Sequence, residues 1–129
     1  MSDELADAVT IRRIAENQTV FRSANERIEG TALGLEIVLH ALPLICECSD
    51  RTCTELLRLT MPEYEHIRQN PRRFFVAPGH QQVAVGLGAA VVVETRDDVV
   101  IVDKIGVAGD IAEETHGLDV SPDDVIPWP

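Results

Sequence analysis

The amino-acid sequence predicts an α+β fold with a long N-terminal amphipathic helix, a second short helix and a small, mainly antiparallel sheet built from hairpins. Apolar or small residues recur at steps of three and four over residues 21–42, which is typical of one face of a helix. Two runs rich in valine and isoleucine, 89–94 and 99–105, enclose a polar turn and so predict a hairpin. All three cysteines of the chain lie close together between these two regions.

The chain has 129 residues, a length that fits one domain, and we expect a single α+β domain over residues 18–118. Residues 1–17 are predicted to form an N-terminal arm or a short helix, because their apolar pattern is only partial. Residues 119–129 are rich in acids and prolines and are predicted to form a tail.

The helix over residues 21–42 is expected to end at Pro43. Gly30 and Gly34 each cost about 1 kcal/mol relative to alanine inside a helix. The helix therefore needs packing against the rest of the chain or against a partner. Core packing is the first interpretation of its apolar stripe, and the seam of a homodimer is the second.

Shorter elements are expected after Pro43. Residues 44–48 and 55–59 are predicted to pair as a second hairpin. Thr60 and Glu63 have the spacing of a capping box, which predicts a helix from there to about Asn70. Residues 72–77 are expected to form a strand, residues 86–88 a flexible turn, and residues 109–114 a short strand or turn.

Charge and hydropathy exclude several classes of function. The net charge of −11 repels phosphate backbones, so nucleic-acid binding is not expected. No apolar run approaches the ~18 residues that cross a membrane, and the N-terminus carries Asp3 and Glu4 where a signal peptide is basic. We therefore expect a cytoplasmic protein without a membrane partner. In that reducing compartment, an odd number of clustered cysteines points to metal or redox chemistry rather than to disulfides.

The cysteines have a spacing that suits a metal ion. Cys46 and Cys48 lie two residues apart, so both side chains would point to the same face of a strand, and the following turn can return Cys53 to that face. Zn²⁺ favours four thiolate or imidazole ligands in a tetrahedron. His80 is the preferred fourth ligand because Pro78-Gly79 predicts a rigid turn before it. The sequence thus predicts a closed, structural Cys3His zinc site.

Other interpretations of this region stay open. The fourth ligand could be His40, His66 or water, and the metal could be other than zinc. The cysteines could be ordinary core residues or redox-active thiols. Three cysteine ligands and a bound water would instead make an open site, as in a metalloenzyme, with Glu47 or His80 as the base.

Charged residues elsewhere have structural interpretations, so no catalytic residues are predicted. Glu63 fits a helix start, and the Glu113-Glu114 pair fits solvated charge. Arg68, Arg72 and Arg73 lie at and after the end of the second predicted helix, where they would complement its dipole. A docking patch for an acidic partner is the second interpretation of these arginines.

Several short motifs occur in a defined order. They are Phe21-Arg22-x-x-Asn25-Glu26-Arg27-Ile28, Cys46-Glu47-Cys48-x-Asp50-x-x-Cys53, Leu59-Thr60-x-x-Glu63-Tyr64-Glu65-x-x-Arg68 and Pro78-Gly79-His80. Through this order, residues 21–115 resemble a family of small uncharacterised bacterial, mainly actinobacterial, proteins. The resemblance implies that the three cysteines and the Pro-Gly-His turn belong to one pattern. The chain departs from it at Gln81, where the family has an acidic residue, and at 116–118, where the family has Asp-Pro-Arg.

Taken together, the sequence predicts a non-enzymatic, zinc-stabilised interaction or regulatory module with a protein partner. The metal would join the hairpin 44–59 to the strand before His80. An open-site metalloenzyme and a thiol-based redox sensor are the alternatives, and neither the process nor the partner is specified by the sequence.

Overall fold

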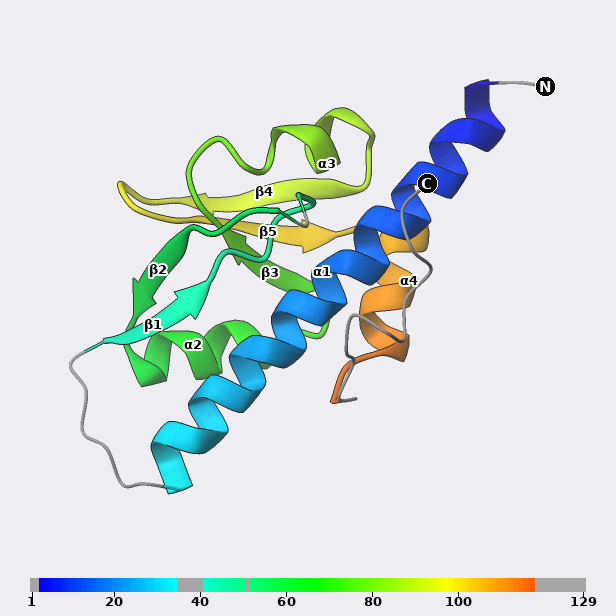
Figure 1. Cartoon of the computed structure of the whole chain (residues 1–129). Coiled ribbons are helices and arrows are strands. Elements are labelled where there is room, and N and C mark those ends of the chain that lie inside the picture. The colour runs from blue at the N-terminus through cyan, green and yellow to red at the C-terminus, as the bar shows by residue number, and fades with distance from the viewer. Residues whose placement is uncertain (1–2, 35–40, 51, 118–129) are drawn as a thin grey trace.

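The computed structural model describes residues 3–34, 41–50 and 52–117. Their elements follow the order α1 (Asp3–Gly34), β1 (Leu42–Ile45), β2 (Leu56–Leu59), α2 (Met61–Arg68), β3 (Arg73–Val76), α3 (Gln82–Gly86), β4 (Ala90–Thr95), β5 (Val100–Lys104) and α4 (Gly106–Glu114). Figure 1 shows α1 crossing the strands obliquely, with α4 beside it. The α+β prediction is confirmed, including the long first helix and the small antiparallel sheets.

The first helix differs from its prediction at both ends. α1 is continuous from Asp3, so residues 3–17 are not a separate arm or helix. Leu42, expected in the last turn of the helix, instead begins β1. The physical reason is Pro43, which disfavours helical backbone in the residue before it. The helical prediction for residues 35–40 lies outside the described residues.

The buried face of α1 is unusually polar in its middle. Ile14, Ala15 and Ala32 are buried, but of these only Ala32 belongs to the predicted apolar stripe over residues 21–42. Between them, however, most of the buried residues carry polar or charged side chains. They are Asn17, Gln18, Thr19, Arg22, Ser23 and Asn25. Burying such groups is unfavourable unless partners satisfy them, so the rest of the fold has to supply those partners.

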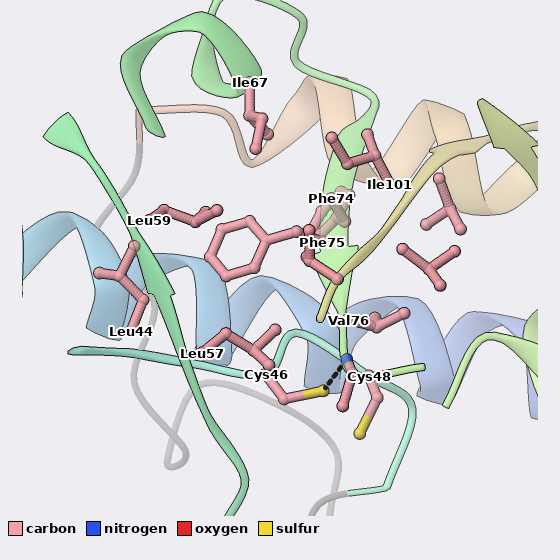
Figure 2. Packing of buried hydrophobic residues seen from close by; sticks show 14 of the residues in the cluster. Leu44, Cys46, Cys48, Leu57, Leu59, Ile67, Phe74, Phe75, Val76 and Ile101 are labelled. Atoms are coloured by element: carbon pink, nitrogen blue, oxygen red, sulfur yellow. Dashed lines mark hydrogen bonds between the residues drawn. The ribbon is translucent and has the colours of Figure 1, made fainter. Parts of the chain in front are cut away.

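The strands form two separate antiparallel sheets. β1 pairs with β2, with Leu44 opposite Leu57, which confirms the predicted hairpin. The predicted strand over residues 44–48 is wrong in its bounds, because β1 ends at Ile45 and residues 46–48 follow it. The second sheet has the order β3-β5-β4, and its β4–β5 pair is the predicted valine-rich hairpin. β5 is central and largely buried, whereas β4 lies at the edge and exposes most of its length. The shared core packs between the sheets and helices; Figure 2 shows Phe74 and Phe75 in its middle, with Cys46 and Cys48 at one end.

The later helices test three sequence predictions. Thr60 and Glu63 form the predicted capping box at the start of α2. The prediction of a strand or turn over residues 109–114 is wrong, because α4 occupies them. Ala108, Ile111 and Ala112 recur at helical steps and are all buried, and this spacing is the signal that the sequence interpretation missed. Residues 86–88 end the short helix α3 and then turn.

Candidate metal site

The fold brings Cys46, Cys48, Cys53 and His80 together. Their ligand atoms all lie within 4.8 Å of one another. Cys46 and Cys48 are buried, and Cys53 and His80 are partly exposed. The residues come from three places in the chain that the hairpin and β3 hold side by side. The predicted Cys3His cluster is therefore present in the structure.

Local backbone geometry positions Cys53. The side chain of Asp50 accepts hydrogen bonds from the amide and hydroxyl of Thr52, at 2.9 and 2.6 Å. The Cys53 amide in turn donates to the carbonyl of Asp50 at 3.0 Å. This is an Asx turn, in which the aspartate side chain imitates a backbone turn. It reverses the chain just after Cys48 and returns the third sulfur to the first two.

A second turn positions His80. Its amide donates to the carbonyl of Ala77 at 2.9 Å, which closes a four-residue turn after β3. Pro78 and Gly79 occupy the two central positions, and Gly79 has a φ of 92°. Proline followed by a residue with positive φ is the signature of a type II turn, which strongly favours glycine there. The Pro-Gly pair thus directs the imidazole towards the cysteines.

The distances inside the cluster suit a tetrahedral ion. The Nδ1 atom of His80 lies 3.6 Å from Sγ of Cys46 and 3.5 Å from Sγ of Cys53. Zinc bonds of about 2.3 Å to sulfur and about 2.0–2.1 Å to nitrogen give a tetrahedral sulfur–nitrogen edge of about 3.6 Å. The donor types and these two sulfur–nitrogen distances therefore suit a metal ion such as Zn²⁺, with Nδ1 as the histidine ligand.

The ionisation of the cysteines also favours a cation. The Cys46 thiol donates to the sulfur of Cys48, which lowers the pKa of Cys48 to about 5 and raises the pKa of Cys46 above its ordinary value. Burial raises the pKa of Cys53. Three adjacent sulfurs repel one another as thiolates, so protons must be retained unless a positive ion compensates the charge. The Ala77 amide adds a hydrogen bond to Sγ of Cys46 at 3.1 Å (Figure 2).

The other candidate ligands do not join the cluster. His66 is exposed on α2, and it lines a different hollow together with Arg73 and Arg96. His40 lies outside the described residues. A small hollow of about 220 Å³ opens beside the cluster and is lined partly by Cys48, Asp50 and His80. The cluster is therefore at the surface of the domain, with its sulfurs partly protected.

Glu47 stands between two of the candidate ligands but points away from them. It is fully buried, and its carboxylate accepts hydrogen bonds from Asn25 of α1 at 2.9 Å and from Arg68 of α2 at 2.5 Å. The amide of Phe75 in β3 donates to the same carboxylate at 3.3 Å. These contacts occupy Glu47 inside the core, so it is not placed to serve as a base at the metal.

Ion pairs with other elements add to the predicted role of the three arginines near the end of α2. Arg68 lies in the last turn of α2, and its guanidinium neutralises Glu47 in the core. Arg72 pairs with Asp110 and Glu113 of α4, and Arg73 pairs with Asp103 of β5. Their main partners therefore lie on other elements. The sequence held one signal of this buried pairing: Glu47 stands between two cysteines, and alternation along an extended segment turns its side chain to the opposite face.

A comparison with known proteins finds no matching family model, no matching curated protein and no matching solved structure. The family resemblance of residues 21–115 thus stays a prediction. Among the described residues, no helix is both long and apolar enough to cross a membrane.

Proposed function

We propose that this protein is a non-enzymatic, zinc-stabilised interaction or regulatory module. The observation that carries the proposal is the convergence of Cys46, Cys48, Cys53 and His80 within 4.8 Å, at spacings suited to a tetrahedral ion. Three thiolates and one imidazole form a closed ligand set of the kind found in structural zinc sites. Such a set leaves no position for a substrate or an activated water.

The metal would join parts of the chain that are distant in sequence. Cys46, Cys48 and Cys53 belong to the first hairpin and its turn, whereas His80 follows β3 of the other sheet. In zinc-dependent domains, the free energy of metal binding contributes directly to folding. The proposed role of the ion is therefore to hold the two sheets in one arrangement, and thereby to fix a surface for a protein partner.

Zinc quantitation on the full chain, purified without chelator, tests the proposal. We expect about one zinc per chain and a large fall in melting temperature after chelation. His80→Asn should lose the metal, whereas His66→Asn, which alters an exposed histidine outside the cluster, should retain it. A zinc content near zero, with melting unchanged by chelator, would overturn the proposal.

Cobalt substitution separates the closed site from the two alternatives. A tetrahedral Cys3His site should give intense d–d bands and sulfur-to-metal charge-transfer absorption with no signature of coordinated water. An open metalloenzyme site would show that water. A redox sensor would give a reversible disulfide in the metal-free protein, most readily through the partly exposed Cys53.

A further inference from the structure

Glu47 links the candidate metal site to the core through the geometry of three consecutive residues. Cys46 and Cys48 direct their sulfurs to the cluster, and Glu47 directs its carboxylate to the opposite side. The Glu47 amide also donates to the carbonyl of Phe75 at 3.0 Å, which fixes this segment against β3. In extended backbone, neighbouring side chains keep opposite directions, so this segment cannot rotate to adjust one face without displacing the other.

The carboxylate side of this segment holds α1 by a pair of residues. Asn25 donates from Nδ2 to Glu47 at 2.9 Å and to the carbonyl of Ile45 at 2.8 Å. The Ile45 amide donates back to Oδ1 of Asn25 at 2.7 Å. Asn25 thus satisfies both backbone groups of the last residue of β1, as a neighbouring strand would. We call these contacts of Asn25 with Ile45 and Glu47 the Asn25 clamp.

The two side chains of the clamp are buried, so small displacements are costly. Asn25 and Glu47 are each 0% exposed. A buried carboxylate or amide that loses its hydrogen-bond partners retains its full desolvation penalty, because no water replaces them. The clamp should therefore be either made or broken as a unit instead of loosening by degrees.

We infer that Glu47 is a positioning residue that couples metal occupancy to the docking of α1. The inference rests on the proposed metal-binding function. With the ion bound, Cys46 and Cys48 are fixed, Glu47 is held in register, and the Asn25 clamp holds α1 on the hairpin. Without the ion, no metal bonds hold the two sulfurs in place, so the segment shifts and the middle of α1 is released. The docking of α1 thus depends on whether the metal site is occupied.

Hydrogen exchange of the full chain, with one zinc bound and after chelation, tests this coupling. In the natural sequence we expect chelation to accelerate exchange at least tenfold over residues 17–30 of α1, and far less in β5. Glu55→Gln, a matched change at an exposed glutamate of the same hairpin, should preserve that difference. Glu47→Gln should still bind zinc but give α1 exchange that no longer depends on the metal.

Reciprocity supplies an independent measurement that does not require Glu47→Gln to fold. If zinc strengthens the clamp, then breaking the clamp must weaken zinc binding by the same factor. Asn25→Ala should therefore reduce zinc affinity about tenfold or more in a chelator competition, whereas Glu26→Gln, at an exposed neighbour on α1, should not.

Three results would overturn the coupling. One is zinc-loaded protein whose α1 exchange is unchanged by chelation, which leaves the proposed zinc site intact. Another is equal acceleration in α1 and β5, which indicates global unfolding in place of a specific link. The third is Asn25→Ala with the zinc affinity of the natural sequence. Protein that binds no zinc at all would overturn the proposed function itself, so the two failures are distinguishable.

Discussion

The segment from Cys46 to Cys48 has a sulfur face and a carboxylate face, and the two faces obtain their compensating positive charge in different ways. Each face carries negative charge away from solvent. On one face the sulfurs gather where a metal ion can compensate them, together with His80. On the other face Glu47 is compensated by Arg68 and by hydrogen bonds from Asn25 and Phe75. The comparison teaches that three consecutive residues just after a strand can anchor both a surface site and a buried network, because alternate side chains point in opposite directions.

The largest effect on the carboxylate face is expected from Arg68→Met. Removing the cation leaves the buried carboxylate of Glu47 uncompensated, which typically costs about 3–5 kcal/mol. The measurement is urea unfolding of the zinc-loaded protein. The double change Glu47→Gln with Arg68→Met should recover much of the loss. Arg58→Met, at an exposed position of β2, is the control and should stay within about 0.5 kcal/mol.

An Arg68→Met protein as stable as the Arg58→Met control would contradict the importance of the buried pair. The carboxylate face would then depend on Asn25 and Phe75 alone.

Lys104 sharpens the comparison because it is a buried amine without a hydrogen-bonded partner among the described residues. Its Nζ lies over the ring of Phe74, and no described residue accepts a hydrogen bond from it. Burial lowers the pKa of Lys104 from 10.5 to about 7. The unfolded chain therefore holds this proton between about pH 7 and pH 10.5, where the folded chain has released it, so stability should rise with pH across that window.

Lys104→Met should remove this contribution to the pH dependence. We expect the variant to be more stable than the natural sequence by about 2–4 kcal/mol at pH 6, with a smaller difference at pH 9. Urea unfolding at both pH values measures it. Lys104 is the only lysine in the sequence, so NMR of the methylated protein can also follow its titration directly. A lysine that titrates near 10.5 in the folded protein would contradict the prediction.

The smallest effect is expected from Thr60→Ala, which lies away from both faces. Its hydroxyl caps the amide of Glu63 at the start of α2, and loss of such a cap costs about 1 kcal/mol. Thermal or urea unfolding should show this loss while zinc content stays at one per chain. Loss of zinc from this variant would show that α2 and the metal site are less independent than the structure indicates.

Elements that are encoded by neighbouring residues could be predicted from the sequence. Properties that depend on how distant elements pack could not. The capping box at Thr60 and the β4–β5 hairpin follow from residues close together in the chain, so their signals survive without the rest of the fold. The sequence could not assign burial to the two strands of that hairpin. β5 is central and β4 is at the edge only because β3 pairs with β5.

The candidate site divides in the same way. By itself, the sequence predicted that Cys46, Cys48 and Cys53 converge, because side-chain alternation over three residues and a tight turn are local properties of the chain. It offered three candidate histidine ligands and favoured His80, and only the tertiary structure placed His80 in the cluster and His66 outside it. The pairing of Glu47 with Asn25 and Arg68 was likewise decided by tertiary structure. Such contacts depend on how helices and strands that are distant in sequence pack together. The spacing of residues along the chain does not encode the relative positions of those elements.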